Sequence, residues 1–235
     1  MEREKFLHIL TSLKRFSLKG LIVVTFSSIV CFMFFKSILN LLLKTVHIKV
    51  YYFTFPEVFF SSVELAIYGG VFFSLPVLII LTWREFKGFI KLKASEGWLF
   101  VVFSIVLFYT GSLFCYFIVL RSGVAFLLGY EGDVLKAMIS VEKFIKFSSA
   151  MIFAFGMTFE VPVILIVLNK MGIVKARTLT KTRRFAILFI TIASAIITPT
   201  PDVYNMMLLA VPTYILYEIS IIIMKIGEKR RKNVY

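Results

Sequence analysis

The stretch that decides the fold is MIFAFGMTFEVPVILIVLNK, residues 151–170, an almost unbroken apolar run with a single acid in it. That acid, Glu160, lies within about one helical turn of the midpoint between Lys146 and Lys170, the two cations that bracket the run. A charge at the centre of a membrane-spanning helix costs about 2.5–3.5 kcal/mol on insertion scales. Because this cost is rarely retained without a role, Glu160 indicates a functional site inside the membrane.

The composition predicts an all-α polytopic membrane protein with one membrane domain over residues 1–235. Of the 235 residues, 60% are hydrophobic and the mean hydropathy is +0.92, whereas ordinary soluble domains are about 45–50% apolar. Cys31 and Cys115 lie in apolar runs and are expected to be packing residues. His8 and His47 have no metal-ligand spacing around them, so neither a metal nor a cofactor is expected.

Six apolar segments are expected to form transmembrane helices, at about 20–43, 58–81, 97–120, 147–169, 185–198 and 203–224. The first four have the roughly 20 residues that a helix needs to cross the hydrocarbon core. A cytoplasmic amphipathic segment, 1–19, precedes them, and a basic tail, 225–235, follows.

The fifth segment is unusually short. Between Arg184 and Thr198 stand only the 13 residues FAILFITIASAII, about 20 Å of helix. A span of this length requires a locally thinned bilayer or ends that protein shelters. A re-entrant hairpin with the sixth segment is the alternative.

The distribution of positive charge predicts the orientation. Of the 27 Lys and Arg residues, twenty lie in 1–19, 84–93, 170–184 and 225–232, and seven lie in the loops between these regions. The positive-inside rule places both termini in the cytoplasm. The net charge of +14 is therefore mainly topological, with attraction to anionic membrane lipid as a second effect. Because the charges are dispersed between apolar segments, nucleic-acid binding is not expected.

Three polar features gather around residue 160. Pro162 cannot donate the backbone hydrogen bond that the carbonyl of Thr158 would accept, and Gly156 lies one turn before Glu160. Together they favour a wet cavity beside the acid. In the alternative, Glu160 is protonated and hydrogen-bonds to a neighbouring helix as a packing residue.

The remaining acids in or near apolar segments have simpler explanations. Glu57 and Asp202 are placed to cap helix N-termini, whereas Glu64 and Glu218 stay open between packing and function. The chain has no G-x-S-x-G, H-E-x-x-H or phosphate-binding glycine loop, so it is not expected to be an enzyme.

Several motifs in order along the chain resemble the TatC family, the polytopic core of the Sec-independent, twin-arginine protein translocase. The longest are AFGMTFEVPVILIVLNKMGIV (154–174) and IITPTPDVYNMMLLAVPTYILYEISI (196–221). Shorter ones precede them: PEVFF (56–60), LPVLIILTW (75–83), ASE (94–96) and FYTGSLFCYFIVL (108–120). The resemblance runs from Pro56 to Lys225.

The resemblance implies a fold and a function. Six helices with both ends cytoplasmic and the last two spans short would form a cupped hand, with Glu160 and Pro162 on its concave side. The protein would sit in a bacterial-type inner membrane and bind the twin-arginine signal peptides of folded cargo. With single-span TatA and TatB subunits, and with further copies of itself, it would export that cargo using the proton-motive force.

The resemblance also assigns site residues. Signal-peptide binding falls to the N-terminal segment, with Ser12, Lys14 and Arg15, and to Glu96 in the first cytoplasmic loop, because guanidiniums bind carboxylates through charge-assisted pairs. Docking of TatA and TatB falls to the polar rim between the last two spans, formed by Thr198, Thr200, Asp202 and Asn205.

Two departures affect the signal-peptide site. The family pattern is approximately H-L-x-E-L-R-x-R, and this chain has HILTSLKRF, which places Ser12 where an acid is expected. A basic pair commonly follows the loop acid, but Gly97 and Trp98 follow Glu96 here. Glu2 and Glu4 have a different spacing. The sequence thus predicts a site that is weaker, differently built, or specialised for few substrates.

Two other functions compete with the translocase interpretation. A secondary transporter or ion pathway would use Glu160 to carry protons or cations, but such proteins usually have inverted repeats and paired broken helices, and this sequence shows neither clearly. A structural scaffold would tolerate Glu160→Ala without loss of activity.

Overall fold

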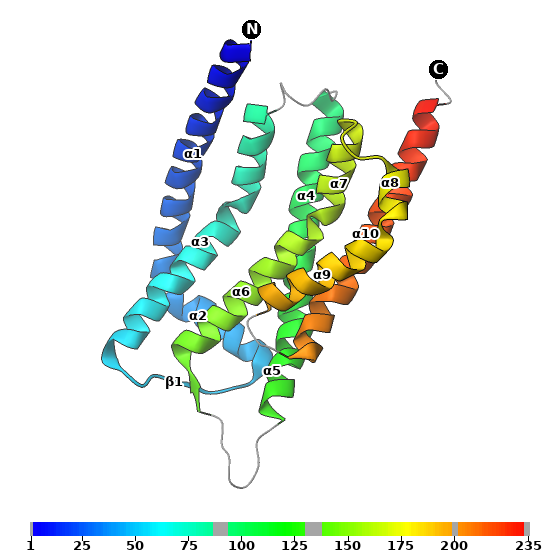
Figure 1. The fold of residues 1–235 in the computed structure, drawn as a ribbon. Helices are drawn as coiled ribbons and strands as arrows, with labels where there is room; N and C mark the ends of the chain where they lie inside the picture. Colours follow the sequence, from blue (N-terminus) through cyan, green and yellow to red (C-terminus); the bar gives the residue numbers. More distant parts are fainter. Residues whose placement is uncertain (1, 87–93, 130–137, 199–201, 233–235) are drawn as a thin grey trace. The chain divides into compact units, whose positions relative to one another are not determined.

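The computed structural model describes residues 2–86, 94–129, 138–198 and 202–232. In these ranges it describes all side chains except those of 2–12, 86, 94–96, 127 and 230–232. Almost all of the described backbone is helical, which confirms the all-α prediction (Figure 1). The elements are α1 (Glu2–Met33), α2 (Phe35–Val46), β1 (Val50–Tyr51), α3 (Phe55–Phe86), α4 (Ala94–Phe114), the π-helix η1 (Cys115–Val119), α5 (Leu120–Leu128), β2 (Ile139–Ser140), α6 (Val141–Phe159), α7 (Val161–Lys170), α8 (Ala176–Lys181), α9 (Arg183–Ile197) and α10 (Val203–Lys232).

Five stretches of the described chain are long and apolar enough to cross a membrane: Leu13–Met33, Phe55–Glu85, Gly97–Phe126, Val141–Lys170 and Val203–Lys229. The sixth predicted segment is α9, which has 15 residues, or about 22 Å of helix. Because α9 is shorter than the usual ~30 Å hydrocarbon core, a sixth crossing stays a prediction.

The chain divides into two compact units: Met1–Ile105 with Ala137–Ser149, and Val106–Lys136 with Ala150–Tyr235. The first unit is built on the pairing of α1 with α3, which run side by side (Figure 1). A Cβ atom added to Gly70 would lie 2.7 Å from the Cα atom of Ser28. The two helices therefore touch backbone to backbone, and only glycine fits at position 70.

The first apolar segment differs from the single helix expected over 20–43. A turn at Phe34 separates α1 from α2, and the Phe34 N–H donates to the carbonyls of both Val30 and Cys31, at 3.3 and 3.2 Å. Gly20, at the boundary between the amphipathic segment and the apolar segment, does not interrupt the helix, so the two segments join into one 32-residue helix.

A short parallel ladder joins distant parts of the first unit. Val50 pairs with Ile139, and Tyr51 pairs with Ser140. Buried Glu57 supports this ladder, because its carboxylate accepts hydrogen bonds from the Phe53 N–H at 2.6 Å and from the Ser140 hydroxyl. Glu57 therefore ties the start of α3 to the start of α6, in addition to the helix-start role that the sequence predicts.

In the second unit, α10 packs against α7, α8 and α9. Helix α10 has 30 residues and includes the start of the predicted tail, so the length of its membrane crossing stays a prediction. Pro212 does not end the helix, and the tail beyond Met224 continues it past Gly227 to Lys232.

Candidate functional site

Glu160 occupies a break in the fourth apolar segment, between α6 and α7. Its N–H donates to the Met157 carbonyl at 3.1 Å, an i−3 bond that tightens the turn, and its own carbonyl accepts from the Ile164 N–H at 3.0 Å. Pro162 lies in the first turn of α7 and is buried, where a missing N–H is tolerated. The proline therefore starts a new helix, and Glu160 becomes the residue at the junction.

The Glu160 side chain is largely covered, with 9% of its surface exposed. The expected space beside it at Gly156 is filled, which is a correction to the sequence interpretation. A Cβ atom added to Gly156 would lie 2.5 Å from the Phe108 ring and 2.6 Å from the Ser112 hydroxyl. Gly156 thus serves the close crossing of α4 and α6, while hydration of Glu160 stays a prediction.

The predicted signal-peptide residues lie at the start of α1 and the start of α4. Lys14 and Arg15 are exposed on α1, whereas the side chains of Ser12 and Glu96 lie outside the part of the chain that the structure describes. Position 97 is packed against α3, because a Cβ atom there would overlap the Trp83 indole. This contact places the backbone beside Glu96 against the C-terminal turn of α3.

Sequence reasoning missed a carboxylate at the same end of the first unit. Glu85, in the last turn of α3, pairs with Lys19 of α1 across 2.7 Å. The charges of Arg15 and Arg84 also act on this carboxylate. The signal for it was the presence of opposite charges at the ends of two apolar segments, but only the register of α1 against α3 brings Lys19 and Glu85 together.

The polar rim between α9 and α10 is mainly internal. The Thr198 hydroxyl donates to the Ser194 carbonyl at 2.8 Å, and Asp202 accepts from the Asn205 N–H at 2.7 Å, as a helix N-cap does. Asn205 is 0% exposed and lies beneath Gly123, where an added Cβ would be 2.5 Å from its side-chain oxygen. Thr198 is also buried. Thr198 and Asn205 therefore support the rim from inside and do not form its exposed surface. Thr200 lies outside the described residues.

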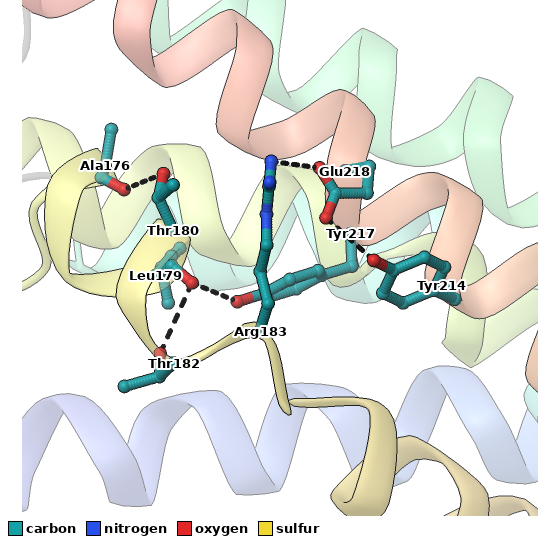
Figure 2. A network of polar contacts seen from close by, with 8 residues as sticks. All are labelled: Ala176, Leu179, Thr180, Thr182, Arg183, Tyr214, Tyr217 and Glu218. Atoms are coloured by element: carbon teal, nitrogen blue, oxygen red, sulfur yellow. Dashed lines mark hydrogen bonds and ion pairs between the residues drawn. The ribbon is translucent and has the colours of Figure 1, made fainter. Parts of the chain in front are cut away.

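A polar network joins α8 and α9 to α10 (Figure 2). Arg183 donates to one oxygen of Glu218 at 2.7 Å, and the Tyr214 hydroxyl donates to the other at 3.0 Å. The Tyr217 hydroxyl donates to the Leu179 carbonyl at 2.9 Å. This arrangement favours a packing role for Glu218, which the sequence left open, because the carboxylate fixes the start of the short helix α9.

Replacing Glu218 with glutamine is expected to lower the free energy of unfolding by about 1 kcal/mol, because a charge-assisted pair is lost but both partners are partly exposed, Glu218 by 25% and Arg183 by 44%. The measurement is thermal unfolding of the purified protein in detergent. Replacing the adjacent exposed cation, Arg184, with glutamine is the control and should leave the melting temperature unchanged. Equal losses for the two variants would contradict a specific role for the pair.

A second set of hydrogen bonds holds α10 through Glu228, near the C-terminal end of the helix. Its carboxylate accepts from the side-chain amide of buried Asn169 at 2.7 Å and from the Ala176 N–H at 2.8 Å. The Asn169 amide also donates to the Val174 carbonyl at 2.8 Å. The tail is thus tied to the loop between α7 and α8.

As for metal ligands, no three His, Cys, Asp or Glu side chains in the described ranges are grouped so that they could hold an ion.

Taken together, long apolar helices, a buried acid at a helix break and a charged end built from α1 and α3 are typical of a polytopic membrane protein with a functional site within its membrane segments. The chain belongs to the TatC family, because the family model described as Sec-independent protein translocase protein (TatC) matches residues 8–212.

Relatives and solved structures agree with this assignment. The TatC of Carboxydothermus hydrogenoformans is 31% identical over 220 residues, covering 92% of this chain and 90% of that protein. The TatC of Desulforapulum autotrophicum is 38% identical over 177 residues, covering 75% and 65%. A crystal structure described as the twin arginine translocase receptor TatC superposes with a TM-score of 0.82 at 29% identity, covering 92% of this chain and 98% of that one.

Proposed function

We propose that this chain is the receptor and core subunit of a twin-arginine translocase. It binds the twin-arginine signal peptides of folded cargo at the end formed by the start of α1, the end of α3 and the start of α4. The observation that carries the proposal is the likeness over 92% of the chain to a solved twin-arginine receptor, together with the family match.

The proposed topology follows the positive-inside rule. All six apolar segments cross a bacterial-type inner membrane, both termini are cytoplasmic, and the helices form one membrane domain shaped like a cupped hand. In this arrangement α9 is the short crossing, with the bilayer thinned beside it.

Within this scheme, the signal peptide binds at the cytoplasmic face and inserts along the concave side, where Glu160 acts at the break before Pro162. Single-span TatA and TatB subunits then dock beside the rim of Thr198, Thr200, Asp202 and Asn205, and the proton-motive force drives transport. Because Thr198 and Asn205 are buried, the partner contacts the exposed apolar side chains around them, which include Ile196, Val203 and Met207. Several copies of the chain assemble in the complex.

The test is export of a folded reporter in cells that lack their own core subunit and carry this chain. A reporter with a twin-arginine signal is expected to reach the periplasm, and the same reporter with two lysines is expected to stay in the cytoplasm. Because a matching set of partner subunits is needed, the small-subunit genes from the same source are supplied with the chain. Failure of export despite normal insertion would favour the transporter or scaffold interpretation.

A further inference from the structure

The two side chains of the Lys19–Glu85 ion pair differ in their exposure to solvent, and this difference matters for binding. The Glu85 side chain is 15% exposed, whereas the Lys19 side chain is 52% exposed. The Glu85 side chain is therefore largely covered, whereas half of the Lys19 side chain stays open to solvent. Such a pair contributes little to stability, so the lysine can be exchanged for another cation at small cost.

Glu85 also lies at the end of the first unit where the signal peptide is proposed to bind. Among the described side chains of this unit, the other acids are Glu57, Glu64 and Glu142. Glu57 and Glu142 lie at the β1–β2 ladder, and Glu64 lies two turns from Glu57 along α3. Glu85 lies at the opposite end of α3, two residues from Trp83, whose ring packs on Gly97 beside Glu96.

A ligand with two guanidinium groups can pair with two carboxylates. A guanidinium binds a carboxylate through two parallel N–H···O bonds, a geometry that an ammonium cannot reproduce. The family resemblance assigns one carboxylate to Glu96, and Ser12 supplies none. Arg15 and Arg84 raise the local positive charge, so an incoming arginine peptide must compete with Lys19 in a field that opposes it.

We propose that Glu85 provides the second carboxylate of the signal-peptide site. At rest this carboxylate pairs with Lys19, and on binding it pairs with an arginine of the signal peptide instead. This inference rests on the proposed function and names the residue that replaces the missing acid at position 12. It predicts opposite effects for the two members of the pair. Glu85→Gln removes the ligand, and Lys19→Gln removes its competitor.

The test uses the full chain in detergent and a fluorescent synthetic peptide with a twin-arginine motif followed by an apolar stretch. Glu85→Gln is expected to weaken binding about tenfold, which corresponds to one charge-assisted pair. Lys19→Gln is expected to strengthen it about threefold, because both competition and repulsion decrease. Melting temperatures are recorded for each variant, and a peptide with two lysines is the specificity control.

The possible outcomes are distinct. If both variants weaken binding, the ion pair only stabilises the packing of α1 against α3, and the inference is wrong. If Glu85→Gln binds as tightly as the wild type, Glu85 is not a ligand, again without affecting the proposed function. If the wild type does not prefer arginine over lysine in the peptide, the proposed function itself fails. Should Glu85→Gln not fold, Lys19→Gln decides alone, and binding that is unchanged or weaker contradicts the inference.

Discussion

Export of a folded twin-arginine reporter is expected to fall at least tenfold when Glu160 is replaced by glutamine, with the amount of inserted protein unchanged. Glutamine keeps the shape of the side chain and cannot ionise. Because only 9% of Glu160 is exposed, its interactions are poorly screened. Hydrogen bonds to a charged group contribute about 1.5–3 kcal/mol, and tenfold corresponds to about 1.4 kcal/mol.

The control for this prediction is Glu142→Gln, which changes an exposed carboxylate at the start of the same apolar segment and should leave export unchanged. Export is measured by fractionation, and insertion by the amount of the chain in the membrane. Unchanged export with Glu160→Gln would show that transport does not require the charge. Export and protein amount falling together would instead support the packing interpretation, in which Glu160 only joins helices.

The second large effect concerns the glycines at helix crossings. Gly70→Ala and Gly111→Ala are each expected to lower the free energy of unfolding by about 1–3 kcal/mol, because overpacked side chains force backbones apart. At Gly70 the new methyl group meets the backbone of Ser28, and at Gly111 it lies 2.7 Å from the Phe155 carbonyl oxygen. This loss exceeds the roughly 1 kcal/mol that alanine gains over glycine as a helix former.

Gly227→Ala in α10 is the matched control, because nothing lies within 4 Å of the added atom. It should be neutral or slightly stabilising, by up to about 1 kcal/mol. Thermal unfolding in detergent measures all three variants. If Gly111→Ala unfolds at the same temperature as Gly227→Ala, then α4 and α6 do not cross as closely as described.

Local chemistry made parts of this fold predictable from the sequence. Apolar length and composition indicate membrane helices because hydrocarbon forces the backbone to satisfy its own hydrogen bonds. Pro162 predicted a missing backbone hydrogen bond beside Glu160, and the structure ends one helix there and starts another, although the prolines inside α3 and α10 interrupt neither helix. Asp202 was recognisable as an N-cap because it stands just before the apolar run of α10.

Features that depend on tertiary register were not predictable. The turn at Phe34 contains no helix breaker, so its position follows from packing and not from propensity. The pairing of Val50 with Ile139 joins segments far apart in the chain. The burial of Asn205 likewise depends on its neighbour Gly123 in another helix, and a single sequence carries no signal of that contact.

The most direct test of the central claim, that this chain is a twin-arginine receptor, is site-specific crosslinking in membrane vesicles. A photoreactive residue replaces exposed Trp98, which follows Glu96 by two positions, and a radiolabelled precursor with a twin-arginine signal is added. A crosslink is expected that an excess of twin-arginine peptide abolishes and a twin-lysine peptide does not. No crosslink at position 98, or one that both peptides compete equally, would contradict the account.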